Sequence, residues 1–214
     1  GQFSRIWMHN EMLQVEGKKM SKSLGNFFTV RDLLDQDIPG EVIRFVFLST
    51  HYSKPMDWTA EKAAEAKSRL FRYMQNIADY ADLETAMRLE PEQAIIDALQ
   101  DDLNTHEALK ALGELDGAAD AAKLARNLVF LGFFTEYSLR ARVDEYKKGI
   151  QMLGALEHRL SLLRDEAMQS KDFTAVDHLK ARLTAAQVNV QMTKTAVHLR
   201  PEMDFDPAKL EGLL

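Results

Sequence analysis

Two lysines with interleaved serines are the residues of this sequence best suited to chemistry. They lie in one short run: Lys19, Met20, Ser21, Lys22 and Ser23. Lysines supply mobile ammonium charges, serines supply hydroxyl donors, and a loop backbone supplies N–H groups. A positioned ammonium also stabilises the charge that develops on a departing pyrophosphate. The run therefore predicts a polyphosphate site, although a solvated basic loop is the simpler interpretation of two lysines alone.

Two turn signals enclose this run. Glu16-Gly17 precedes it and Gly25-Asn26 follows it, so we expect residues 18–23 to form a surface loop with a glycine at each end. Glycine permits the backbone rotations by which a loop opens and closes. The sequence before the first turn is apolar and β-compatible, which predicts a strand and a hairpin. The apolar residues there are Phe3, Ile6, Trp7, Met12, Leu13 and Val15.

Helical periodicity dominates from residue 29 onward. Thr29 and Asp32 fit a capping box, and Pro39 lies in the first turn of the next predicted helix. Further helices are expected from Thr59, from Pro91 and from Thr105 as a cap, and their apolar stripes predict an antiparallel bundle. The stripes are Ala63, Ala66, Leu70, Tyr73, Ile77 and Tyr80; Ile95 and Leu99; Leu109 and Leu112; Leu124, Leu128 and Leu131; and Leu139, Val143, Tyr146, Ile150, Leu153, Leu160 and Leu163.

The period changes near the end of the chain. Asp172 is expected to cap a short helix. One face of that helix carries Phe173, Val176, Leu179 and Leu183. Apolar and polar residues then alternate on both sides of residues 193–195, which predicts a small β-hairpin. Residues 206–210 predict one last helical turn.

Bulk properties exclude several classes of protein. The chain has 214 residues, of which 46% are hydrophobic and 28% charged, as is typical of a globular protein. With no cysteine and six scattered histidines, disulfides are excluded, a reducing compartment is permitted and no metal site is expected. No apolar run predicts a membrane span. The net charge of −6 weakly opposes nucleic-acid binding, but residues 155–200 carry seven Lys/Arg against five acids, which leaves a local basic face open.

The run at 19–23 matches, at all five positions, the second ATP-binding motif of class I aminoacyl-tRNA synthetases. The residues around it resemble the cysteinyl-tRNA synthetases along nearly the whole chain, most closely before residue 60. The matching segments are 7–10 (WMHN), 19–27 (KMSKSLGNF), 29–33 (TVRDL), 51–55 (HYSKP), 101–105 (DDLNT) and 164–183. Two departures concern His106, where that family has proline, and residues 193–200, where it has a Gly-Thr-x-Trp-Arg segment.

The resemblance implies an enzyme that joins cysteine to its tRNA with ATP, with this chain as its C-terminal half and inactive alone. Lys22 would then contact ATP and act in catalysis with Lys19, and Ser21, Ser23 and Met20 would complete the ATP site. The implied cofactors are Mg²⁺ with ATP and a zinc ion whose ligands lie upstream of this chain. The implied partners are tRNA(Cys), cysteine and ATP, and we expect a cytoplasmic monomer without a membrane partner. Two alternatives stay open: the cysteine ligase of mycothiol biosynthesis, and a non-catalytic tRNA-binding fragment.

The expected fold is mainly α. It comprises the end of a class I Rossmann catalytic domain with its phosphate loop, then an antiparallel helical bundle and a small α+β C-terminal piece. The expected segments are 1–30 for the catalytic remnant, 31–58 for a connecting region that contacts the tRNA stem, 59–155 for a tRNA-binding bundle, and 156–214 for a C-terminal helical pair and hairpin that would read the anticodon.

Further tRNA contacts are predicted at residues that also have simpler interpretations. His51 could contact the acceptor stem, and Trp58 could stack on a base, although tryptophan more often packs in a core. The C-terminal pair carries a basic face that could contact phosphates or could be an ordinary solvated surface. Its residues are Arg159, Arg164, Lys171, Lys180, Arg182 and Lys194. We interpret Asp101-Asp102 as an interhelical turn rather than a catalytic pair.

Overall fold

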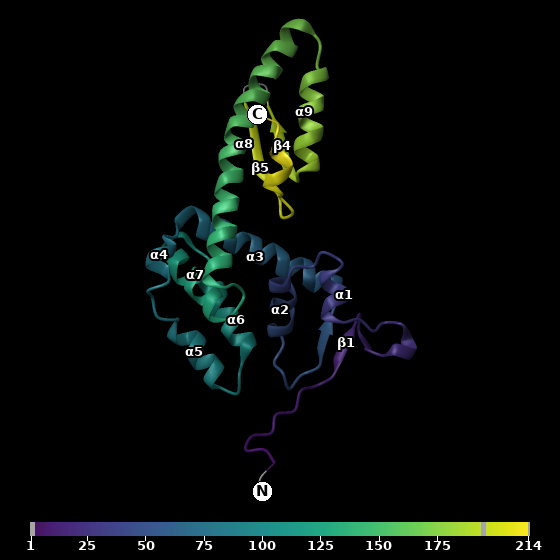
Figure 1. Cartoon of the computed structure of the whole chain (residues 1–214), viewed down its shortest axis with the longest axis vertical. Helices are drawn as coiled ribbons and strands as arrows, with labels where there is room; N and C mark the ends of the chain where they lie inside the picture. Colours follow the sequence, from purple (N-terminus) through teal and green to yellow (C-terminus); the bar gives the residue numbers. More distant parts are fainter. Residues whose placement is uncertain (1–2, 194–195, 214) are drawn as a thin grey trace. The chain divides into compact units, whose positions relative to one another are not determined.

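The computed structural model describes residues 3–193 and 196–213 and is mainly helical, as predicted (Figure 1). The chain divides into two compact units, Gly1–Leu139 and Arg140–Leu214. Unit 1 contains β1 (Leu13–Val15), β2 (Lys18–Lys19), the 3₁₀ helix η1 (Lys22–Leu24), α1 (Val30–Leu34), α2 (Gly40–Leu48), β3 (Met56–Trp58), α3 (Ala60–Tyr80), α4 (Leu83–Ala86), α5 (Gln93–Gln100), α6 (Thr105–Glu114), η2 (Ala118–Asp120) and α7 (Ala121–Phe130). Helix α8 (Glu136–Ser170) continues into unit 2, which also contains α9 (Thr174–Ala185), β4 (Val188–Met192), β5 (Val197–Pro201) and η3 (Pro207–Leu210).

A three-stranded sheet lies at the start of unit 1, in the order β2-β1-β3. Strands β1 and β2 form the predicted hairpin around Glu16-Gly17, where both residues have positive φ (50° and 73°). Two such residues are typical of a type I′ turn, whose twist matches that of the flanking strands. Strand β3 pairs with β1 in parallel, with Val15 opposite Trp58. This parallel pair joins the start of the chain to the residues that precede α3.

The helices of unit 1 bury the predicted stripes against one another. Helix α2 packs on α3, α3 on α7, and α5 on α6. Tyr73, Ile77 and Leu112 are fully buried, and the side chain of the buried Asn127 accepts a hydrogen bond from Glu92 N (3.0 Å). The described helices contain none that is both long and apolar enough to cross a membrane.

Several sequence predictions in unit 1 were wrong in detail. Residues 3–10 form no strand, and Phe3, Ile6 and Trp7 are exposed, because no described strand lies beside them. Tyr80 is 63% exposed because it lies at the last residue of α3. The cap of α6 is Asn104 rather than Thr105, since the Asn104 side chain accepts the N–H of Glu107. Helix α4 was not predicted at all.

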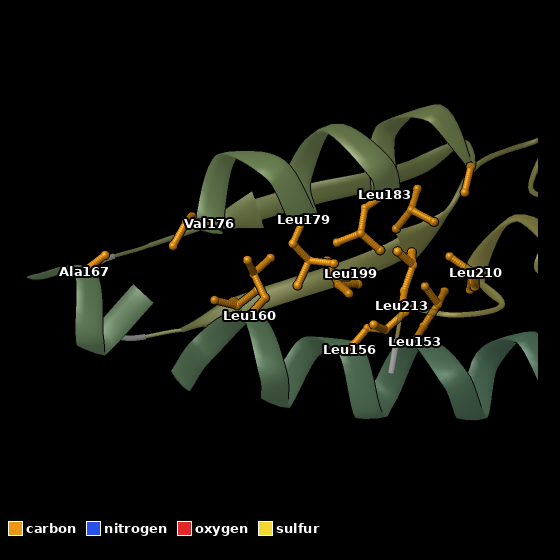
Figure 2. Close-up of a cluster of buried hydrophobic side chains, with 13 residues drawn as sticks. Leu153, Leu156, Leu160, Ala167, Val176, Leu179, Leu183, Leu199, Leu210 and Leu213 are labelled. Carbon is orange, nitrogen blue, oxygen red and sulfur yellow. The ribbon is translucent and has the colours of Figure 1, made fainter. Parts of the chain in front are cut away.

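Unit 2 has a core of its own, formed by α8, α9 and the predicted hairpin. Figure 2 shows leucines of α8 and α9 pointing toward each other in one cluster. The alternate residues of β4 and β5 that begin with Val188 and Val197 turn one face of the hairpin to this core. Strands β4 and β5 are antiparallel, with Val190 opposite Leu199. The tail closes this core because Leu210 and Leu213 are buried in it, and η3 is the predicted last turn, capped by Asp206. Gly149 of α8 lies under the tail, where an added Cβ would come within 2.7 Å of the Phe205 ring.

Helix α8 runs without interruption through residues 155 and 156, where two of the predicted segments meet, and the two compact units meet at Leu139 and Arg140. Asp172 accepts hydrogen bonds from Thr174 N (3.0 Å) and Thr174 Oγ1 (2.7 Å), so it caps α9 from two residues outside it. Phe173 is exposed and does not join the buried face of α9. The predicted phosphate contact Lys194 lies outside the described residues.

The core of unit 2 allows a matched test of stability. Leu160 is fully buried in it, whereas Leu162, two residues along the same helix, is 52% exposed. Leu160→Ala should lower the free energy of unfolding of unit 2 by about 2–5 kcal/mol, through lost burial and the cavity left behind. Leu162→Ala should change it by less than about 0.5 kcal/mol. Urea denaturation followed by circular dichroism measures both; equal losses would contradict this core.

Candidate functional site

The hairpin that carries the lysine–serine run is fixed to β3 and α3 by its turn. Gly17 N donates to both carboxylate oxygens of Asp57 (3.0 and 3.1 Å), and Glu16 N donates to Trp58 O (3.0 Å). The Glu16 carboxylate accepts in turn from Ala60 N (3.0 Å) at the start of α3. The turn is therefore held by residues about 40 positions downstream.

The lysine–serine run, residues 19–23, is partly regular rather than the plain loop predicted. Lys19 ends β2, Met20 N donates to Leu13 O (3.2 Å), and residues 22–24 form η1. Helix η1 ends at Gly25, whose φ of 70° is left-handed and whose N–H donates to Lys22 O (3.2 Å). Both predicted glycines thus occupy positions that a side chain would strain. In Figure 1 the segment between β1 and α1 extends away from the helices of unit 1.

The side chains of the run present cations and hydroxyls at the surface. Lys19, Lys22 and Ser23 are exposed, while Met20 and Ser21 are half-buried. The hydroxyls of Ser21 and Ser23 lie 2.8 Å apart. The Lys22 ammonium lies 5.3 Å from the centre of the Phe27 ring, a cation–π contact that a stronger anionic ligand can replace. Neither lysine forms an ion pair with a carboxylate in the described ranges, so both charges are available to a polyphosphate.

Sequence reasoning missed the role of Asn26, which it used only as a turn signal. Its Oδ1 accepts from Ser21 N (2.9 Å) and its Nδ2 donates to Lys19 O (3.2 Å). The one signal in the sequence for this role was an asparagine directly after a glycine.

After Asn26, the predicted capping box starts α1. Thr29 N donates to the Asp32 carboxylate (2.6 Å), and the Thr29 hydroxyl donates to the same carboxylate (2.8 Å). These two hydrogen bonds, the backbone one most, lower the pKa of Asp32.

His51 forms a contact with the turn between α5 and α6. Its Nε2 lies 2.8 Å from Asp102 O, so that nitrogen donates, and its Nδ1 accepts from Ser53. The Tyr52 hydroxyl donates to the Asp102 carboxylate (2.6 Å). Asp102 and Leu103 both have positive φ, which confirms a tight interhelical turn. A cavity of about 320 Å³ lies beside it, lined by apolar and polar residues of unit 1 that include His51, Tyr52 and Leu103.

Two predicted tRNA contacts are occupied by packing. Trp58 is 5% exposed and contacts Phe28 and Phe47, so its ring faces do not offer a base a surface in this structure. The Arg164 side chain is 13% exposed and donates to Thr193 O (3.3 Å) and Asp165. From the sequence alone, both side chains could also lie at the surface. Their burial depends on partner residues that are not their sequence neighbours.

Other basic residues of unit 2 remain at its surface. Lys171 and Arg182 are exposed and Lys180 is half-buried. Arg182 lines a cavity of about 500 Å³ together with Arg159 and His178, while Arg159 also donates to Leu213 O (2.5 Å). These residues belong to unit 2, whereas the lysine–serine run belongs to unit 1.

Comparison with known proteins decides the family. The family described as tRNA synthetases class I (C) catalytic domain matches residues 1–68. The cysteine–tRNA ligase of Paracoccus denitrificans (strain Pd 1222) is 55% identical over 98% of this chain, and that of Jannaschia sp. (strain CCS1) is 52% identical over 99%. The cysteine–tRNA ligase of Ruegeria sp. (strain TM1040) is 51% identical over the whole chain. The chain belongs to the cysteine–tRNA ligase family.

The match covers only part of each relative. The chain spans 43% of the Paracoccus cysteine–tRNA ligase and 45% of the Ruegeria and Jannaschia proteins, and it corresponds to their C-terminal part. The class I family model ends at residue 68, within α3, so it includes the hairpin, the lysine–serine run and β3. Among residues 3–193 and 196–213, no group of three or more His, Asp or Glu side chains is placed to hold a metal ion.

The contact between Tyr52 and Asp102 gives a testable pKa. The hydrogen bond to the Asp102 carboxylate raises the pKa of Tyr52 above its ordinary value of 10.0, since it favours the protonated phenol. The stabilisation from this bond is present below pH 10 and is lost as the pH rises through the raised pKa. Asp102→Asn should bring the Tyr52 pKa back toward 10, measured by NMR of ¹³C-labelled tyrosine. The neighbouring Asp101→Asn is the control, and an unchanged Tyr52 titration in Asp102→Asn would contradict the contact.

Proposed function

We propose that this chain is the C-terminal part of an enzyme that activates cysteine with ATP and transfers it to tRNA(Cys). The observation that carries the proposal is the lysine–serine run itself. Its five residues match the class I ATP motif, its two ammonium groups are free of ion pairs among the described residues, and it lies within the segment that matches a class I catalytic domain. Relatives above 50% identity carry the name cysteine–tRNA ligase, which supports cysteine as the amino acid.

The proposed chemistry begins with attack of the cysteine carboxylate on the α-phosphate of ATP. The bond from that phosphorus to the β-phosphate oxygen breaks, and pyrophosphate leaves with its negative charge. Lys22, assisted by Lys19, would stabilise that charge as it develops, and Ser21, Ser23 and the backbone at Met20 would bind the phosphates. A hydroxyl of the terminal ribose of the tRNA then attacks the cysteinyl carbonyl, the bond from that carbon to the phosphate oxygen breaks, and AMP leaves as the hydroxyl loses its proton. Mg²⁺ would accompany ATP, and the zinc of the family would have its ligands upstream of this chain.

We assign a separate role to each of four successive segments of the chain. Residues 1–30 would be the end of the Rossmann catalytic domain, 31–58 the stem-contacting region with His51, 59–155 the tRNA-binding bundle and 156–214 the anticodon-binding piece. We retain Lys171 and Arg182, which are exposed, and Lys180, which is half-buried, as phosphate contacts. We propose no such role for Trp58 or Arg164, which are occupied by packing and hydrogen bonds. The proposal places the enzyme in the cytoplasm as a monomer.

Two other functions make different predictions. The cysteine ligase of mycothiol biosynthesis would share the ATP chemistry but transfer cysteine to an amino sugar, without tRNA. A non-catalytic fragment would bind tRNA without forming an adenylate. A full-length protein that carries this chain is supplied with cysteine, ATP and a tRNA pool. Only the proposed enzyme produces cysteinyl-tRNA, and of the other two only the mycothiol ligase forms an adenylate.

The ATP role of Lys22 is tested in that full-length protein. Lys22→Ala should slow cysteine-dependent ATP–pyrophosphate exchange by about a hundredfold, or about 3 kcal/mol of transition-state stabilisation. Unfolding stability should change by less than about 0.5 kcal/mol, because Lys22 is exposed. Lys209→Ala, which removes an exposed lysine from η3, is the control. An exchange rate equal to that of the control would remove Lys22 from the mechanism.

The basic face of unit 2 is tested by salt dependence. Arg182→Ala should weaken tRNA(Cys) binding and reduce the slope of log K against log salt by about 1. The reason is that each phosphate contact releases about one counterion when it forms, and the variant forms one contact fewer. Arg5→Ala is the matched control, because Arg5 is an exposed arginine in segment 1–30, to which we assign no tRNA contact. Fluorescence anisotropy over a series of salt concentrations gives both slopes, and equal slopes would argue against this face.

A further inference from the structure

One side chain hydrogen-bonds to the backbone on both sides of Met20. Asn26 accepts from Ser21 N through Oδ1 (2.9 Å) and donates to Lys19 O through Nδ2 (3.2 Å). The two bonds together, which we call the Asn26 brace, fix the backbone that connects Lys19 with Lys22. In the described part of the chain, Asn26 is the one side chain that hydrogen-bonds to the backbone of residues 19–23.

The brace depends on the left-handed turn that precedes it. Gly25 has φ of 70° and donates to Lys22 O, which reverses the chain and returns Asn26 to the run. An added Cβ at Gly25 would meet no atom within 4 Å, so it is the backbone conformation and not crowding that favours glycine there. At the other end, Asp57 fixes Gly17. The run is thus anchored at its start by β3 and held internally by Asn26.

We propose that Asn26 is a positioning residue for the reaction proposed above, on which this inference rests. The run has no buried side chain of its own, so nothing in a core fixes the relation between its two lysines. The brace keeps Lys19 and Lys22 on one rigid stretch of backbone, and both ammonium groups therefore reach the same polyphosphate together. Preorganisation of this kind acts on the chemical step, because charges already in place need no reorganisation as pyrophosphate departs.

Three variants separate the brace from a general effect of losing an asparagine. Asn26→Ala removes both hydrogen bonds, and Asn26→Asp keeps the acceptor for Ser21 N but removes the donor to Lys19 O. Asn189→Ala is the control, because Asn189 bonds to a Glu202 side chain (3.3 Å) in the hairpin of unit 2. In the 214-residue chain, trypsin should cleave after Lys19 and Lys22 about tenfold faster in Asn26→Ala, because the two lost hydrogen bonds no longer oppose local opening of the backbone. The rate for Asn26→Asp, which loses one of the two bonds, should be intermediate.

Kinetics test the positioning role itself. In a full-length cysteine–tRNA ligase carrying this chain, Asn26→Ala should lower kcat for ATP–pyrophosphate exchange about tenfold, while the KM for cysteine stays within about twofold of the unmodified value. A merely structural residue would not separate the two constants. Kinetic constants equal to those of Asn189→Ala overturn the positioning role, even if cleavage quickens. Absence of cysteine-dependent exchange in the unmodified protein would instead refute the proposed function, and the trypsin comparison would still decide whether the brace exists.

Discussion

The parallel pairing of β1 with β3 is the constraint on which the candidate site depends. Strand β1 has three residues and β2 has two, and an isolated hairpin of this size is not stable in water. Strand β3 supplies the missing neighbour, and its Asp57 carboxylate accepts the N–H of Gly17 at the hairpin turn. The lysine–serine run therefore takes its position from a strand that follows it by about 40 residues.

The segment between these two strands must bring β3 back beside β1. Helix α2 does so by burying four apolar residues, Val42, Ile43, Phe45 and Val46, against its neighbours. The loop after α2 is then fixed by His51 and Tyr52, which both bond to Asp102 in the turn between α5 and α6. Because these contacts all lie within unit 1, the lysine–serine run and the helices share one framework.

The sequence predicted features whose causes are local, and it missed those whose partners are distant. The capping box at Thr29 and the C-terminal hairpin were correct because the residues that make them lie within a few positions of each other. The burial of Trp58 confirms the core-packing interpretation, but its partner rings, Phe28 and Phe47, come from two other segments and were not predicted. The role of Asn26 was missed for a different reason, because it depends on the left-handed conformation of the adjacent Gly25. The division into units was also out of reach, since periodicity continues through α8. A residue type shows what chemistry it can do, but burial decides whether it is available.

Charge near the lysine–serine run follows a consistent rule. The nearby carboxylates bind backbone N–H groups instead of lysines: Asp57 binds Gly17, Glu16 binds Ala60 and Asp32 binds Thr29. Each such bond is satisfied within the local fold and fixes a strand end or a helix start. A carboxylate placed against Lys19 or Lys22 would have to be displaced before a polyphosphate could bind, at the cost of a formed ion pair. Carboxylates committed to the backbone hold the framework together while leaving both ammonium groups to an incoming anion.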